Sequence, residues 1–359
     1  MKAALVSLGS KSSLMVLESM KKYFDSVSNI NLKNIEVNLG SGKLDVLYEG
    51  KALSKYDCIY ARGSFRYAPL LRSITNALSQ TTYMPIKAET FTIGHDKLLT
   101  HLALQLYKIP MPTTYLASSP IAAKKILQKI NYPIILKFPT GTGGKGVMYA
   151  ESFAAASSML DALETLRQPF LIQEYIETGG TDIRALVAGG RVIASMKRKA
   201  ILGEERANIH AGGKGEACVL DSHTKNIAIS TAQSIGAEIC AVDILESPKG
   251  PLVIEANLSP GLQGITEATK MDVAGKIAEY LYERAKQFTE SGKKIGAKEI
   301  LEELSIKREG KPAQQIITNL DMRSDRILLP KLITDITKFN DKEEFVITAK
   351  DGELSIKKV

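Results

Sequence analysis

The sequence predicts a mixed α/β (α+β) fold with a small N-terminal α/β domain, a larger central domain and a small β-rich extension. Short apolar segments typical of strands alternate with segments of helical periodicity through most of the chain. A glycine-rich stretch at 140–147 lies between two strand-like segments, and a polar stretch follows the last long helix. We therefore predict domains at 1–88 and 89–290, a linker at 291–300 and an extension at 301–359.

Length and charge limit the classes of protein that fit. The 359 residues suffice for two or three domains, and no apolar run reaches the about 18–20 residues that a membrane helix needs. The net charge is +8, and residues 301–359 hold 11 basic and 11 acidic residues, so the excess lies before them. A basic body suits a nucleotide, an acidic peptide or a nucleic acid, although solubility alone would also explain it. Three scattered cysteines without a CxxC pair indicate a reducing, cytoplasmic setting.

The first 130 residues are expected to form the N-terminal unit and the start of the central domain. The stretch HDKLLTHLALQLYKI has apolar residues at helical spacing, and Pro110 and Pro112 then block its continuation. The remaining elements expected here are a strand AALVSLG, a helix SLMVLESMKKYF, strands IEVNL, DVLYEG, DCIYARG and TYLA, and a helix SPIAAKKILQKI.

The central region is expected to hold two antiparallel hairpins besides the glycine-rich stretch. TDIRALVAGGRVIASMKRKA reads as two strands around a Gly189-Gly190 turn, and ICAVDILESPKGPLVIEANLSPG as a hairpin turning at 247–250. The other expected elements are strands PIILKF, VMYA and FLIQEYI and helices SFAAASSMLDALETL, TKNIAISTAQSIG and DVAGKIAEYLYERAKQF.

The glycine-rich stretch is predicted to be a phosphate-binding flap. Gly141, Gly143 and Gly146 match GxGxxG, but a dinucleotide site requires a helix after the last glycine, whereas the β-type segment VMYA follows. The Walker pattern fails because Gly146 follows Lys145, where Ser or Thr is required. A loop between antiparallel strands can offer the backbone N–H groups around Gly143, Gly144 and Lys145 to phosphates. The alternative is a merely flexible hairpin tip.

Lys137 is the single charge in the apolar strand before the flap. A buried lysine costs several kcal/mol unless it is paired, so we expect it to meet an anion such as a phosphate. An edge lysine that reaches water is the alternative.

The second hairpin carries a candidate site for Mg²⁺ or Mn²⁺. Glu255 and Asn257 are two apart on a strand and share a face, and the hairpin brings Asp243 roughly opposite Glu255. Converging carboxylates repel unless a cation lies between them, and three hard oxygen donors suit Mg²⁺. Two independent surface carboxylates are the alternative.

A basic stretch, MKRKAILGEERANIHAGGKG, places Arg198, Arg206, Asn208 and His210 in an expected loop. A solvated run of charge is its ordinary explanation. Because the sequence also predicts a phosphate-binding flap and a hairpin with a metal site, Arg198, Arg206 and Asn208 become candidates for stabilising the negative charge of a phosphate group during its transfer.

These motifs, in this order, resemble the ATP-grasp superfamily, and most of all its RimK-type amino-acid ligases, which include α-L-glutamate ligases. The resemblance covers about residues 88–288. It is carried by DKLLT with Pro110 and Pro112, PIILKFPTGTGGKGV, LIQEYIETGGTDIRALVAGG, KRKA followed by ERANIHAGG, GAEICAVDIL and VIEANLSPGLQGI.

The resemblance implies a role for each matching position. Lys137 and Lys97 would contact ATP, Gln173 to Ile176 would line the adenine pocket, and Asp182 would lie near the ribose. Arg206 and Asn208 would act at the γ-phosphate, with Asn208 also near metal. The implied nucleotide-binding residues are Lys97, Lys137, Gly143, Gly144, Lys145, Gln173, Glu174, Tyr175, Ile176, Asp182, Arg206 and Asn208. The implied metal ligands are Asp243, Glu255 and Asn257, and the substrate residues are Arg184, Asn257, Ser259, Pro260 and Gly261.

The implied function is ATP-dependent ligation of a carboxylate to an amine through an acyl phosphate, with L-glutamate added to an acidic acceptor, either a protein tail or a small anionic cofactor. Gln263 and Thr266 stand where these glutamate ligases commonly carry acidic residues, which leaves the identity of the amino acid open. The alternatives are another ATP-grasp peptide or amino-acid ligase, or a nucleotide-sensing regulator with a DNA-contacting tail.

The C-terminal stretch from Arg323 faintly resembles AbrB-like swapped-hairpin domains. Its balanced charge argues against nucleic-acid binding, which needs clustered Lys and Arg. We expect a module for dimerisation or substrate docking, in a homo-oligomer (dimer or tetramer); a small β cap on the ligase body is the alternative.

Overall fold

The computed structural model describes most of the chain, in two compact units, Met1–Gly296 and Ala297–Val359. Its described residues are 1–40, 43–141, 146–165, 167, 169–199, 214–306, 321–323, 326–329, 331–337, 339–340, 344–351 and 353–358.

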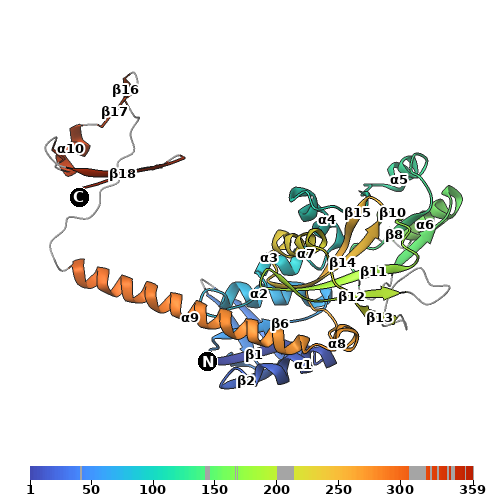
Figure 1. The fold of residues 1–359 in the computed structure, drawn as a ribbon, viewed down its shortest axis with the longest axis horizontal. Helices are drawn as coiled ribbons and strands as arrows, with labels where there is room; N and C mark the ends of the chain where they lie inside the picture. Colours follow the sequence, from blue (N-terminus) through green and yellow to red (C-terminus); the bar gives the residue numbers. More distant parts are fainter. Residues whose placement is uncertain are drawn as a thin grey trace. The chain divides into compact units, whose positions relative to one another are not determined.

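The N-terminal residues form a small parallel sheet with the strand order β2-β1-β6. The central strand β1 reads as an apolar run because it is covered on both faces, and residues Ala3 to Val6 are fully buried. The strands β2, β1 and β6 of this sheet lie side by side (Figure 1). A separate antiparallel sheet, β3-β4-β5, lies between β2 and β6 in the chain. The elements are β1 (Lys2–Ser7), α1 (Lys11–Met20), β2 (Ser26–Asn31), β3 (Ile35–Gly40), β4 (Lys43–Tyr48), β5 (Lys51–Ala52), β6 (Cys58–Ala61) and α2 (Ala68–Leu78).

Two short helices, α3 (Ala88–Ile93) and α4 (Lys97–Leu106), lead into the central region. Asp96 caps α4, since its side chain accepts hydrogen bonds from the backbone N–H groups of Leu98 and Leu99 at 2.8 and 3.0 Å. The cap fixes Lys97 as the first helical residue.

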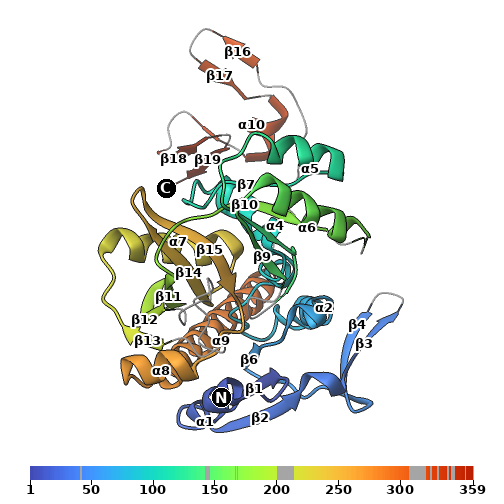
Figure 2. The ribbon, with the colours of Figure 1, turned by 90° about the vertical axis from the view of Figure 1, so that its right-hand side faces the viewer.

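The glycine-rich stretch joins two antiparallel strands, as predicted. Strands β7 (Thr114–Tyr115), β10 (Leu171–Glu174), β8 (Ile134–Lys137) and β9 (Val147–Ala150) form one sheet in that order. Because β9 pairs with β8 where a dinucleotide-binding fold would have a helix, that alternative is excluded. Helices α5 (Pro120–Leu127) and α6 (Phe153–Thr165) pack side by side on this sheet and enclose a small core of their own (Figure 2).

A five-stranded antiparallel sheet, β13-β12-β11-β14-β15, forms the other half of the central region. Both hairpins lie where the sequence predicted them; Gly189 and Gly190 have φ of +60° and +72°, which favours glycine at a tight turn. The strands of this sheet are β11 (Thr181–Ala188), β12 (Arg191–Lys199), β13 (Lys214–Ala217), β14 (Ile239–Ser247) and β15 (Gly250–Asn257). The helices of this half are α7 (Ser222–Ile235), α8 (Gln263–Thr269) and α9 (Val273–Ile306).

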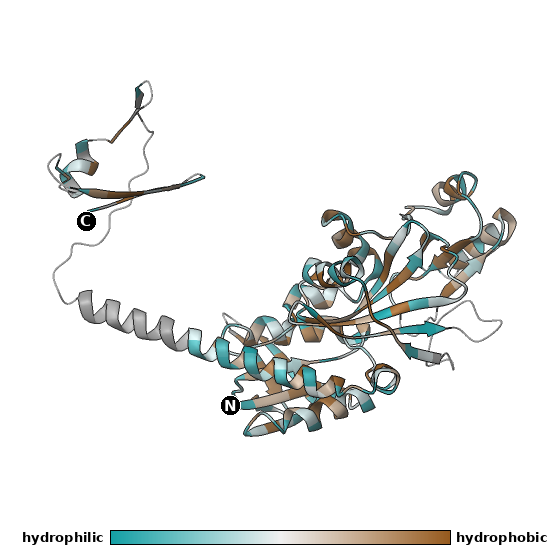
Figure 3. Cartoon of the chain, in the orientation of Figure 1, coloured by the Kyte–Doolittle hydropathy of each residue, from teal (hydrophilic) through white to brown (hydrophobic). Residues whose placement is uncertain are grey.

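This sheet and the N-terminal sheet share one hydrophobic core, to which α7 and α9 contribute. Brown, hydrophobic segments run along its strands, whereas the helices show both colours (Figure 3). The shared core explains why Met1–Gly296 is one compact unit. A domain boundary at residue 88 would lie inside this unit, and it stays a prediction. The linker expected at 291–300 is helical instead, because α9 continues through it.

The described residues of the second unit contain, besides the end of α9, a short helix and two hairpins. They are β16 (Asp321–Arg323), β17 (Arg326–Leu328), α10 (Lys331–Thr337), β18 (Phe345–Lys350) and β19 (Glu353–Lys358). The AbrB-like resemblance stays a prediction. Within the described ranges, no helix has the length and apolar character to cross a bilayer.

Candidate active site

A single cavity of about 820 Å³ collects most of the predicted site residues. Its walls come from both central sheets and from loops of the N-terminal sheet. The predicted residues that line it are Lys97, Lys137, Gln173, Glu174, Tyr175, Ile176, Asp182, Arg184, Arg198, Asp243, Glu255, Asn257, Ser259 and Gly261.

The remaining predicted residues fall into two groups. Pro260 is not among the lining residues; its carbonyl accepts a hydrogen bond from Arg62. The others lie outside the described residues, so their roles stay predictions: Gly143, Gly144, Lys145, Arg206, Asn208 and His210.

Lys137 is a buried cation with a neutral partner. It is 5% exposed at the end of β8, and its Nζ donates to Gln173 Oε1 at 2.8 Å. Gln173 in turn donates through Nε2 to Thr114 Oγ1 at 2.7 Å and lies 3.0 Å from His101 Nε2. Burial lowers the pKa of Lys137 to about 7, although the charge of Glu255 partly opposes this. An anion in the cavity would restore the charged form of Lys137.

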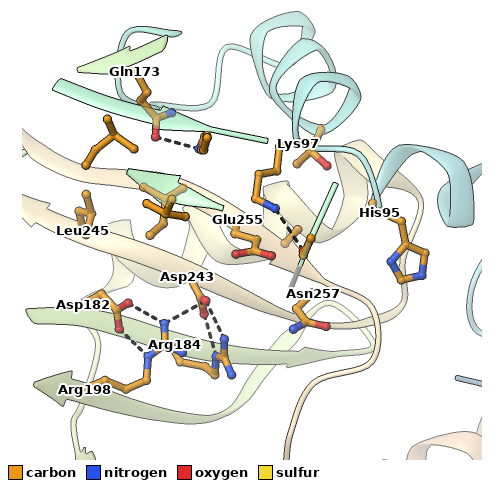
Figure 4. Close-up of a pocket in the computed structure, with 18 of the residues that line it drawn as sticks. His95, Lys97, Gln173, Asp182, Arg184, Arg198, Asp243, Leu245, Glu255 and Asn257 are labelled. Carbon is orange, nitrogen blue, oxygen red and sulfur yellow. Dashed lines mark hydrogen bonds and ion pairs between the residues drawn. The ribbon is translucent and has the colours of Figure 1, made fainter. Parts of the chain in front are cut away.

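The N-terminal end of the flap, up to Gly141, is anchored to α4. Lys97 donates from its backbone to Pro139 O at 2.8 Å and from Nζ to Gly141 O at 3.3 Å. At the other end, Gly146 has φ of +78°, and a Cβ there would lie 2.2 Å from the Phe138 ring. Lys97 and Lys137, which lie close enough for the charge of Lys97 to act on Lys137, therefore line the same cavity as the ends of the flap (Figure 4 shows Lys97).

Asp182, Arg184, Arg198 and Asp243 form a charged cluster on three neighbouring strands (Figure 4). The strand register places Arg184 opposite Asp243 and Asp182 opposite Arg198. Arg184 donates from Nε and Nη2 to Asp243 at 2.8 and 2.7 Å, and Arg198 donates from the same two atoms to Asp182 at 2.6 Å each. Arg198 Nη2 also lies 2.9 Å from Asp243 Oδ2.

This pairing sets the charge states of the cluster. Burial alone would raise the pKa of Asp243, but Arg184 and Arg198 hold it below its usual range, so Asp243 is ionised. The prediction that Arg198 lies in a loop was wrong, because it is part of β12 and uses its guanidinium on Asp182 and Asp243. Asp182 lines the cavity and orients Arg198, and its expected position beside the ribose stays a prediction.

Comparison with known proteins identifies the family. Residues 94–281 match the model of the RimK-like ATP-grasp domain. A protein named "Probable alpha-L-glutamate ligase" from Thioalkalivibrio sulfidiphilus is 34% identical over 291 residues, covering 80% of this chain and 97% of the relative. A protein of the same name from Methanococcoides burtonii is 35% identical, with the same coverage. The chain belongs to the RimK-like ATP-grasp family.

A solved structure supports the fold of this ATP-grasp ligase. The ATP-grasp ligase PsnB, complexed with a phosphomimetic variant of a minimal precursor, Mg and ADP, superposes with a TM-score of 0.63. The match covers 79% of this chain and 98% of PsnB at 16% identity.

Two of the three predicted metal ligands fit a divalent cation. Glu255 and Asn257 line the cavity from the same face of β15, and no hydrogen bond to the Glu255 carboxylate occurs among the described residues. Asn257 Oδ1 accepts from the backbone of Ser259 at 3.0 Å and keeps a second lone pair. Asp243 lies opposite Glu255, as predicted, but both its oxygens are used by Arg184 and Arg198. Asp243 as a third ligand therefore stays a prediction.

The ATP-grasp site also contains residues that sequence reasoning missed. An apolar wall suited to a flat base is made by Ile135, Val147, Tyr149, Leu245 and Ile254 beside the predicted Tyr175 and Ile176. These are ordinary strand residues, so nothing in the sequence marks them. The N-terminal sheet adds Leu8, Ser10, Ser13, Arg62, Gly63 and Ser64. Arg62 did carry a signal, since it is a charge directly after the apolar strand β6.

Proposed function

We propose that this chain uses ATP to activate a carboxylate as an acyl phosphate, which the amine of an amino acid then attacks to form an amide. The observation that carries the proposal is the buried Lys137, whose hydrogen-bond partner among the described residues is the neutral Gln173, and which faces a cavity that Glu255 also lines, a carboxylate without a hydrogen bond from those residues. A buried cation and an open carboxylate suit phosphate and a divalent cation, respectively.

The residues of the chain act by position and charge. Lys137 and Lys97 hold the nucleotide phosphates beneath the flap, while Tyr175, Ile176 and the apolar wall receive the base. Glu255 and Asn257 would hold Mg²⁺, which neutralises phosphate charge when bound. The apolar walls and the flap exclude water, which would otherwise hydrolyse an acyl phosphate. The reaction needs no nucleophile from the enzyme, so catalysis comes from orientation and electrostatics.

We propose L-glutamate as the amino acid and an acidic acceptor. The name carried by the two relatives supports glutamate. The net charge of +8, which lies before residue 301, suits an acidic peptide tail or a small anionic cofactor. Another ATP-grasp peptide ligase is the second candidate, because the ATP-grasp ligase PsnB was solved with a precursor peptide.

The test is amino-acid-dependent release of ADP. Purified protein with ATP and Mg²⁺ is given each of a panel of amino acids together with acidic peptides, and products are weighed by intact mass. The proposal expects ADP release that depends on one amino acid, with mass increments of one glutamyl residue on the acceptor. ATP binding without turnover under every condition would instead support a nucleotide-sensing regulator.

We further propose that the protein is a cytoplasmic homo-oligomer joined through its C-terminal unit. Val346, Ile347 and Leu354 on the β18-β19 hairpin are 56%, 64% and 48% exposed, and a lone two-stranded hairpin is marginally stable in water. Light scattering of the full chain should give a dimer or tetramer, and Ile347→Asp should give a smaller species. A wild-type monomer would contradict this.

A further inference from the structure

The carboxyl ends of two neighbouring parallel strands meet the cavity at a place to which no role has yet been given. Strands β1 and β6 pair in parallel, and the residues directly after them line the cavity. Ser10 and Ser13 follow β1, and Arg62 and Ser64 follow β6. Crevices at the carboxyl ends of parallel strands are common ligand sites, because side chains and backbone N–H groups of several loops converge there.

Arg62 is a buried guanidinium that has no acidic partner in the part of the chain that the structure describes. Its side chain is 2% exposed, and its Nη2 donates to Pro260 O at 2.7 Å. It also lies 5.5 Å from the ring centroid of Tyr60 and contacts the Tyr60 hydroxyl from Nη1 at 3.4 Å. Within the described ranges, Nε has no hydrogen-bond acceptor and Arg62 is in no ion pair. Arg184 and Arg198 are each paired with aspartates, whereas no described carboxylate pairs with Arg62.

The same loops hold the segment predicted to receive the amino acid. The backbone N–H of Gly63 donates to Ser259 Oγ at 3.0 Å, and Arg62 holds the carbonyl of Pro260. Ser12 Oγ accepts from the backbone of Leu262 at 2.8 Å. Substrate at this segment would therefore lie against the loops after β1 and β6.

A second buried atom without a hydrogen-bond partner among the described residues belongs to the residue after Gly94, which packs at the start of this segment. Gly94 packs so closely on Leu258 that a Cβ would lie 2.9 Å from its side chain. The next residue, His95, lines the cavity, and its buried Nε2 has no partner among the described residues. Buried polar atoms are almost always hydrogen-bonded, so two orphans beside one segment indicate a missing polar ligand.

We propose that Arg62, with the hydroxyls of Ser10, Ser13 and Ser64, binds a substrate carboxylate that is not the one phosphorylated. This subsite rests on the proposed ligase function and deepens it. The cavity then has two anion-binding ends, with phosphates at Lys97 and Lys137 and a carboxylate at Arg62. The carboxylate belongs either to the incoming amino acid or to the acceptor, and the chemistry of recognition is the same for both.

Binding of two probes to the full chain separates these sources. Calorimetry in the presence of Mg²⁺ and a non-hydrolysable ATP analogue measures the affinity for L-glutamate, which has a free amine, and for N-acetyl-L-glutamate, which has none. Arg62→Gln should weaken one of the two by about tenfold or more, which is the usual effect of losing a charge-assisted hydrogen bond. Loss of L-glutamate binding alone assigns the site to the amino acid; loss of the acetylated probe alone assigns it to the acceptor.

The controls keep the result interpretable. Arg72→Gln, at an exposed position on α2, should leave both affinities unchanged. Affinity for the ATP analogue should change less than about twofold in Arg62→Gln, because Arg62 lies outside the phosphate end. If Arg62→Gln does not fold, Arg62→Met, which keeps the apolar stem, takes its place.

The proposal fails if both probes bind Arg62→Gln as they bind wild type, or if wild type binds the nucleotide but neither probe. It also fails if neither variant folds, since Arg62 would then serve to hold the Pro260 segment. Failure of wild type to bind the nucleotide contradicts the proposed function itself, so the two failures are distinguishable.

Discussion

Replacing Lys137 by methionine should stabilise the protein and remove nucleotide binding at the same time. Methionine has nearly the length of the lysine stem and fills the same buried space without a charge. In the nucleotide-free protein, the buried charge of Lys137 destabilises the folded state, because its hydrogen-bond partner, Gln173, is neutral. In the nucleotide complex, the same charge faces phosphate.

The magnitude follows from the pKa of Lys137, which burial lowers from 10.5 to about 7. At pH 7, this difference corresponds to about 4 kcal/mol of lost folding free energy. Methionine removes that loss but leaves Gln173 Oε1 without a donor, which costs about 1–3 kcal/mol. The net gain is therefore about 1–3 kcal/mol, or about 2–6 °C in Tm for a unit of this size.

The assay is thermal unfolding of wild type and Lys137→Met, with and without ATP analogue and Mg²⁺. Lys124→Met is the matched control: this partly exposed lysine pairs with Asp161 outside the cavity, so its loss should change stability by less than about 1 kcal/mol. Lys137→Met should melt higher than wild type and show no shift with nucleotide. A variant that melts several degrees lower and still responds to nucleotide would refute the reasoning.

Three further predictions concern the same cavity. Glu255→Ala should abolish ATP turnover with an unchanged circular dichroism spectrum, because it removes the cavity carboxylate suited to Mg²⁺; wild-type rates would contradict the assignment. The pKa of Lys137 is lower in the folded state than in the unfolded one, so the unfolding free energy should rise between pH 7 and 10.5. Nucleotide affinity should fall by up to about tenfold per pH unit above 7, because the neutral amine no longer attracts phosphate. A nucleotide affinity that calorimetry finds unchanged over this pH range would contradict this role of Lys137. Gly146→Ala forces a side chain to φ of +78° against Phe138, and should raise the KM for ATP several-fold; an unaltered KM would show that the flap base is not strained.

Local pattern was enough to predict most of the hairpin geometry. Strand alternation and the turn at 247–250 placed Asp243 near Glu255, although a regular register would pair Asp243 with Ile254 and a β-bulge between Asp243 and Ile244 brings Glu255 opposite it. The β-type residues after Gly146 correctly excluded a helix there. These features depend on residues close together in the chain, where periodicity and turn chemistry dominate.

Long-range pairing could not be predicted in the same way. Arg198 was expected in a loop because its flanking charges resemble solvent-exposed sequence, yet β12 continues through it and β11 supplies Asp182 as its partner. The helical course of 291–300 was missed because polar residues fit a long exposed helix as well as a linker. Arg62 escaped notice because its significance depends on β1 lying beside β6.

A crystal structure with ADP and Mg²⁺ bound tests the central claim most directly. We predict a phosphate within hydrogen-bond distance of Lys137 Nζ and a metal ion bound by Glu255 and Asn257. Nucleotide bound elsewhere, with Lys137 still donating only to Gln173, would contradict the account.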